Sequence, residues 1–158
     1  MAMLSHSLRL VNKMKDRLLF QWDSIQNLTE EGASLSLGWF EFYHNGLSIS
    51  FFKERKCMLF LTLTNLIDFL SSENVNNSFK WVGEDDGSVY VLKRKDKYLQ
   101  IENRSVLIKI NYDLFKSVVF DASLNMKNNI LSKNPHIREE GAFIDFENSV
   151  KKIAENSV

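Results

Sequence analysis

The chain has 158 residues with 44% hydrophobic and 25% charged side chains, and its formal net charge is zero. A length of this order favours one domain, with internal units at about 35–72 and 79–132. Neutrality argues against a dedicated nucleic-acid binder, which usually carries a basic excess, and the single cysteine excludes an intramolecular disulfide.

The beginning of the chain lacks the continuous apolar stretch of a signal peptide, because Ser5, His6, Ser7 and Arg9 interrupt it. No window approaches the roughly 20 apolar residues that a membrane helix needs. We therefore expect a cytoplasmic protein without membrane contact.

The first predicted element is an amphipathic helix over about residues 6–30. Its apolar positions recur at steps of three and four residues, as in a helix with one buried face. The stripe consists of Leu4, Leu8, Val11, Lys15, Leu18, Trp22 and Ile25, and Met14 and Leu19 widen it.

From residue 34 the hydrophobic period changes to two, which predicts a strand up to Tyr43. Asn45-Gly46 predicts a tight hairpin turn, because both central positions of a type I′ turn need positive φ. The return strand is expected at 47–52 and a third strand at 57–63. A short helix ending near Ser72 follows, with Thr64 or Asn65 as its cap.

Four further strands are predicted at 79–82, 88–92, 97–102 and 106–110, separated by turns that include 93–96. Asn111 or Asp113 caps a longer helix that Pro135 ends. A last helix is expected at about 143–156, with a short strand at 143–146 as the open alternative.

The fold class predicted by these elements is α+β, because consecutive strands joined by short turns pair antiparallel. Two strand-rich units are each followed by a helix, with an amphipathic N-terminal helix and a C-terminal helix added. Several strands are apolar on both faces, so helices are expected to cover one side. A small-molecule pocket or a homodimer formed through an exposed apolar face would also account for them.

No motif for catalysis or a cofactor is present, so we expect a protein that is not an enzyme and binds no cofactor. Cys57 stands in a predicted strand, where a cysteine is usually buried and inert, although Lys53, Arg55 and Lys56 flank it. The three histidines lack metal-ligand spacing, so no metal site is predicted.

An acidic turn is formed by Glu84, Asp85 and Asp86. Such a run is ordinarily a solvated loop. Its functional interpretation is a contact that steers a basic protein partner through long-range attraction.

Two basic turns occupy matching places in the two units. They consist of Lys53, Arg55 and Lys56 in the first unit and Lys93, Arg94, Lys95 and Lys97 in the second. With Trp39, Phe40, Tyr43 and Tyr98 nearby, they are candidates for a single-stranded nucleic-acid surface of rings and cations. The plainer interpretation is that basic turns keep strand edges soluble.

The repeated order of strands and a helix over about residues 35–132 resembles whirly and related single-stranded DNA-binding domains. The same architecture resembles that of small bacterial toxin-immunity proteins, including those of contact-dependent growth inhibition. This resemblance implies an immunity protein that neutralises a partner toxin by surface complementarity. The alternative is a single-stranded nucleic-acid-binding protein.

Overall fold

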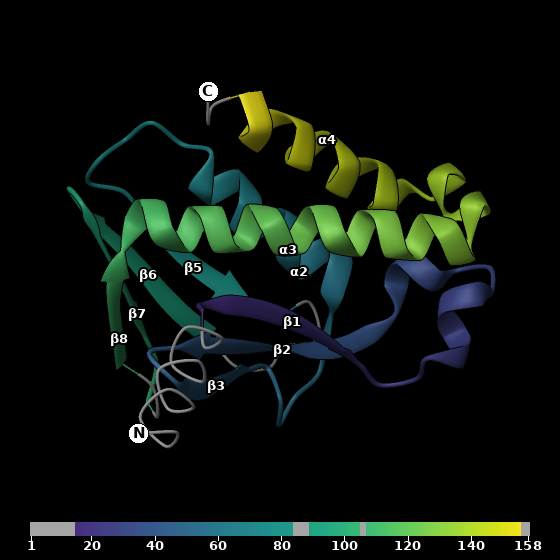
Figure 1. Cartoon of the computed structure of the whole chain (residues 1–158), viewed down its shortest axis with the longest axis horizontal. Helices are drawn as coiled ribbons and strands as arrows, with labels where there is room; N and C mark the ends of the chain where they lie inside the picture. Colours follow the sequence, from purple (N-terminus) through teal and green to yellow (C-terminus); the bar gives the residue numbers. More distant parts are fainter. Residues whose placement is uncertain (1–14, 84–88, 105–106, 156–158) are drawn as a thin grey trace, which may run out of the picture.

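The computed structural model describes residues 15–83, 89–104 and 107–155. Within these ranges the chain forms two four-stranded antiparallel sheets, three α-helices and three 3₁₀ helices. The order is four strands and a helix, then again four strands and a helix, and a last helix (Figure 1). The predicted α+β class with antiparallel sheets is therefore confirmed.

The first sheet, sheet A, consists of β1 (Arg17–Trp22), β2 (Leu37–His44), β3 (Leu47–Phe51) and β4 (Cys57–Met58). β2 is central, with β1 on one side and β3 and β4 on the other. The turn between β2 and β3 has φ of 51° at Asn45 and 78° at Gly46. These values confirm the predicted hairpin, which needs positive φ at both positions.

The second sheet, sheet B, is a meander of β5 (Ser78–Val82), β6 (Val89–Lys95), β7 (Tyr98–Glu102) and β8 (Leu107–Asn111). Side chains alternate between a buried inner face and an outer face. Trp81, Leu92, Leu99 and Ile101 are fully buried on the inner face. The outer face carries mainly polar side chains.

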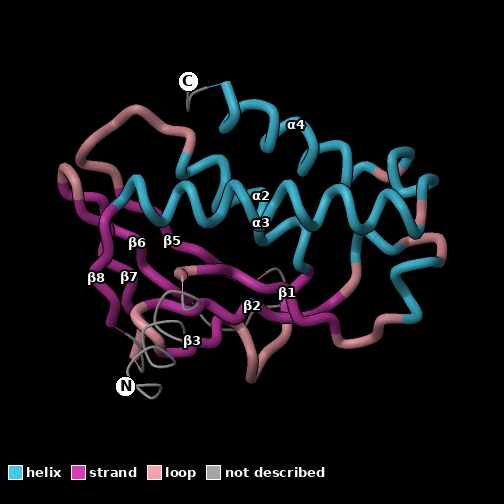
Figure 2. The backbone as a smooth tube through the Cα atoms, viewed as in Figure 1, coloured by secondary structure: helices cyan, strands magenta, loops and turns pink. Residues whose placement is uncertain are grey.

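The helices are α2 (Leu59–Leu70), α3 (Tyr112–Lys133) and α4 (Gly141–Glu155). Figures 1 and 2 show all three on one side of the strands, with α3 running across both sheets. α2 packs mainly against α4, and α3 packs against β1, β7 and β8. Their apolar stripes thus cover the inner faces of the sheets, as expected.

The two sheets meet through aromatic rings. Phe51 and Phe52 contact Trp81 and Tyr90, with ring centroids 4.9 to 5.4 Å apart. The indole Nε1 of Trp81 donates to the carbonyl of Thr62, 2.8 Å away, in α2. Such edge-to-face contacts add stabilisation beyond apolar burial, so the aromatic residues largely build the core.

The predicted N-terminal helix is wrong where the structure describes it. Arg17–Trp22 form β1, and Gln26–Thr29 form only a 3₁₀ helix. Leu18 is buried whereas Leu19 is 38% exposed, so the period is that of a strand. Leu18 and Trp22 are four residues apart, and residues at this spacing lie on the same face in a helix and in a strand, so the spacing does not distinguish the two. Residues 6–14 of the predicted helix lie outside the described residues.

The predicted third strand at 57–63 is also wrong beyond its first two residues, because α2 begins at Leu59. Nearly all of α2 is buried, and a continuous apolar run has no period that separates a buried helix from a buried strand. Thr64 is not the cap: its hydroxyl donates to the Phe60 carbonyl inside the helix, 2.7 Å away.

The end of the chain follows the prediction more closely. The Asn111 side chain accepts a hydrogen bond from the Leu114 amide and caps α3. Residues 143–146 are helical within α4, which decides between the two alternatives. None of the helices in the described ranges is both long and apolar enough to cross a membrane.

Candidate nucleic-acid interface

The outer face of sheet B collects cations around one exposed ring. Lys93 and Lys95 project from β6, Tyr98 and Gln100 from β7, and Lys109 from β8. These five side chains are here called the lysine–tyrosine face. Lys95 and Tyr98 are direct cross-strand partners, as are Gln100 and Lys109. The antiparallel register therefore places side chains from β6, β7 and β8 next to one another on this surface.

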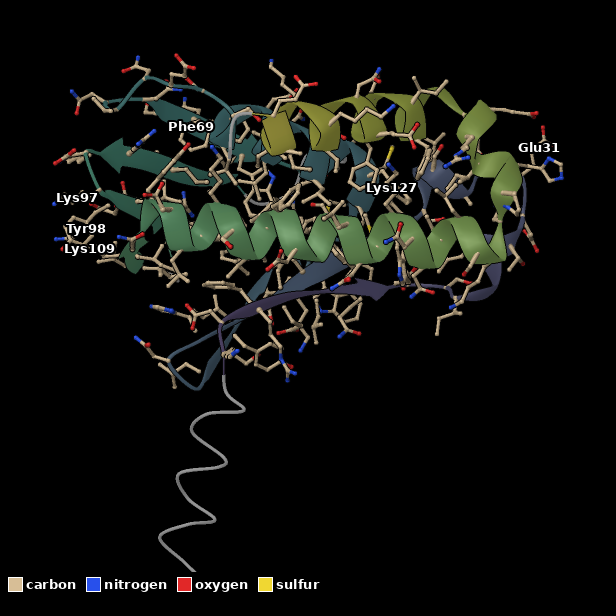
Figure 3. All side chains as sticks on the ribbon, turned by 45° about the horizontal axis from the view of Figure 1, so that its top comes forward. Glu31, Phe69, Lys97, Tyr98, Lys109 and Lys127 are labelled. Carbon is tan, nitrogen blue, oxygen red and sulfur yellow. The ribbon has the colours of Figure 1, made fainter. Side chains whose placement is uncertain are left out.

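Tyr98 is 50% exposed, and the Lys109 Nζ lies 4.7 Å from its ring centroid. Figure 3 shows Lys97, Tyr98 and Lys109 together at one end of the molecule, far from Glu31. A cation held beside an open ring matches the two groups that single-stranded nucleic acid contacts, phosphate and base.

Glu102 reduces the positive charge of the lysine–tyrosine face. Its Oε1 lies 3.1 Å from the Lys93 Nζ, and its Oε2 accepts a hydrogen bond from Gln100 at 3.1 Å. The adjacent Lys93 ammonium holds the pKa of Glu102 below its ordinary value. Lys93 is thus partly neutralised, whereas Lys95 and Lys109 are exposed.

The two predicted basic turns belong to different sheets. The Phe52 amide, beside Lys53, donates to the Tyr90 hydroxyl at 3.3 Å. Tyr90 and Lys95 stand at opposite ends of β6, five residues apart, which is about 17 Å in a strand. Lys56 pairs with Asp23 at 2.5 Å, so the first basic cluster belongs to sheet A.

The second basic cluster is also divided. β6 runs through Lys95, so Lys93 and Lys95 are strand residues and only Lys97 lies in the turn. Arg94 faces the opposite side, where its Cζ lies 3.6 Å from the Tyr112 ring centroid. The predicted turn at 93–96 is therefore wrong, and Arg94 supports the core.

The four aromatic candidates, Trp39, Phe40, Tyr43 and Tyr98, also do not all lie on one sheet. Phe40 is fully buried. The Trp39 Nε1 donates to Glu41 at 2.9 Å, and Tyr43 lies under the Arg17 guanidinium, 4.6 Å from ring centroid to Cζ. Of the four rings, Tyr98 alone accompanies the basic strands of sheet B.

The remaining candidates show no catalytic arrangement. Cys57 is fully buried, and burial raises the pKa of its thiol to about 11. His44 contacts Asp16, 2.6 Å from Nδ1 to Oδ2, at the end of β2. Among the described residues, no three His, Cys, Asp or Glu side chains are grouped to hold a metal. Glu84, Asp85 and Asp86 lie outside the described residues.

Lys80 and Lys109 are exposed outer-face residues that the sequence interpretation missed. Their positions alternate with buried Trp81 and Ile108, and this alternation was available in the sequence. The cross-strand register that brings Lys109 to Tyr98 was not, because register depends on the type and length of the turn between β7 and β8, which the sequence interpretation did not specify.

Comparisons of the chain with protein-family models, with curated proteins and with solved structures found no match. The described element order has four strands in each unit, one more than predicted in the first. The resemblance to whirly-type domains and to immunity proteins stays a prediction from that order.

Proposed function

We propose that this protein is a non-enzymatic binding protein that holds single-stranded nucleic acid on the lysine–tyrosine face. The observation that carries the proposal is the exposed Tyr98 ring between Lys95, its strand partner, and Lys109. An aromatic ring stacks on any base, and flanking cations neutralise phosphates. The neutral net charge is no obstacle, because Lys93, Lys95 and Lys109 lie together on one face.

The spacing of the lysine ammonium groups also fits the phosphates of an extended single-stranded nucleic acid. Lys93 and Lys95 are two residues apart on β6, about 7 Å, and Lys109 is two strands from Lys93, about 10 Å. Because Glu102 pairs with Lys93, we expect Lys95 and Lys109 to neutralise about two phosphates, which gives a slope of about −1.4 for log affinity against log salt concentration on a single strand.

The test is fluorescence anisotropy of a labelled oligothymidylate of about twelve nucleotides, titrated from about 50 to 200 mM salt. Tyr98→Ala should weaken binding at least fivefold, about 1 kcal/mol for one stacked base. Tyr43→Ala is the matched control, because Tyr43 also lies under a cation but on sheet A. No binding at low salt, or equal losses in the two variants, would remove the proposal.

The second candidate is the immunity or inhibitor protein. It is favoured by exposed apolar side chains on the outer face: the strand partners Val82 and Val89 are 39% and 41% exposed, and Leu107, on β8, is 71% exposed. The acidic residues Glu84, Asp85 and Asp86 connect Val82 to Val89 in the sequence. Exposed apolar side chains are common at the centre of protein interfaces, and the acidic sequence indicates that the partner would be a basic toxin domain.

This candidate is tested by co-expression with the product of the adjacent upstream gene. Leu107→Asp should abolish protection of the cell and co-purification of the two proteins. Leu47→Asp is the control, because Leu47 is 67% exposed on sheet A. Lack of protection by the unmodified protein would dismiss the candidate for this gene pair.

A further inference from the structure

A depression lies beside the lysine–tyrosine face, where the chain enters β5. Its volume is about 420 Å³, within the range of sites that hold small ligands. Its lining comprises Asn76, Asn77, Ser78, Lys93, Arg94, Lys95 and Asp96. It is open to solvent.

The depression arises because the segment before β5 continues the antiparallel pairing with β6. The Arg94 amide donates to the Asn77 carbonyl at 2.8 Å, and the Asp96 amide donates to the Val75 carbonyl at 3.0 Å. Ser78 is the partner of Lys93, so the continued register places Asn76 beside Lys95. Alternation then puts Asn76 and Ser78 on the same side as Lys93 and Lys95.

The lining combines apolar and hydrogen-bonding groups. The aliphatic stems of Lys93 and Lys95 offer apolar surface while their ammonium groups stay in water. The Asn76 amide is held by the Asn74 side chain, 3.1 Å from N to Oδ1, and Asn76 is exposed. The Asn76 side-chain carboxamide, a separate group from this backbone amide, offers a donor and an acceptor to the depression that the residue lines.

We propose that this depression seats one unstacked nucleobase, with adenine preferred, and this inference rests on the proposed function. The base of the neighbouring nucleotide stacks on Tyr98, the strand partner of Lys95. Unstacked bases present their edges to side chains, and a carboxamide pairs with N6 and N7 of adenine. Lys95, shared by the depression and the face, contacts the phosphate between the two nucleotides.

The experiment compares two labelled strands of about twelve nucleotides, one of thymidines alone and one with a single central adenine. The unmodified protein should bind the adenine strand about fivefold more tightly, the lower end of the discrimination by a bidentate contact. Asn76→Ala should abolish this preference and leave the affinity for the thymidine strand and its salt slope unchanged. Asn128→Ala, on an exposed position of α3, should retain the preference.

The outcomes separate the two proposals. If both strands bind equally, or if Asn76→Ala keeps the preference, the adenine site is refuted and the lysine–tyrosine face stands. If neither strand binds, the proposed function fails and the adenine site fails with it. Melting temperatures of the variants show whether they are folded.

Discussion

Burial of Cys57 has a chemical consequence at the residue scale. Only the thiolate attacks a disulfide reagent, and burial raises the pKa of this thiol from 9.0 to about 11. We expect the native protein to react with Ellman's reagent at pH 8 only as fast as it unfolds, and at once in denaturant. Complete reaction of the native protein within seconds would contradict the buried position.

The raised pKa of the Cys57 thiol also determines how the stability of the fold changes with pH. The protonated thiol favours the folded state, so its contribution is complete below pH 9.0 and is lost as the pH rises through about 11.

Glu102 permits a test of charge on the lysine–tyrosine face. Glu102→Gln removes the carboxylate 3.1 Å from the Lys93 Nζ and frees that cation for phosphate. Exposed charge pairs are weak because water and salt screen them, so affinity for labelled oligothymidylate should rise only about twofold. Glu139→Gln makes the same change of charge at the exposed 3₁₀ helix Pro135–Glu139. An equal rise in both variants would mean that net charge alone acts.

Residues of the candidate site were predictable only in part. Tyr98, Lys95 and Lys97 were identified from composition and their place beside a turn. Arg94 was assigned to the same cluster, but alternation along β6 sends it to the Tyr112 ring. The sequence predicted side chains near the site, whereas alternation along each strand decides their face and cross-strand register decides which of them are neighbours.

At the scale of elements, Gly38 shows how closely β2 is packed. A Cβ at this position would lie 2.6 Å from the Leu59 Cδ1 and closer still to the Gln21 carbonyl. Gly38→Ala should lower the free energy of unfolding by about 3 kcal/mol, as overpacking does, measured by urea denaturation. Gly141→Ala is the control, because nothing lies within 4 Å of its Cβ. Similar stability of the two variants would contradict the packing of β2 against α2.

Elements were predictable where the period of hydrophobicity was distinct. The hairpin at Asn45-Gly46, the meander of sheet B and the cap of α3 follow from local sequence. The strand Arg17–Trp22 and the helix Leu59–Leu70 do not, because one contains a four-residue step and the other is apolar on nearly every side. Tertiary contacts decide such segments, here with β2 and with α4.

At the scale of the whole molecule, the zero net charge includes two basic clusters that belong to different sheets. Lys95 lies on the lysine–tyrosine face of sheet B, whereas Lys53 follows β3 of sheet A, next to Phe52, whose amide donates to the Tyr90 hydroxyl. Both lysines are exposed, so their reversal changes the net charge equally and disturbs no buried group. This makes them a matched pair for locating the interface.

Lys95→Glu should weaken binding of labelled oligothymidylate at least tenfold, because it removes a phosphate contact and adds repulsion beside Tyr98. Lys53→Glu should change the affinity less than threefold at about 150 mM salt, where charges more than about 8 Å away are largely screened. Lys95→Glu should also make the salt slope shallower, whereas Lys53→Glu should leave it unchanged. Equal effects of both charge reversals would mean that the oligonucleotide contacts both basic clusters, as the sequence interpretation proposed.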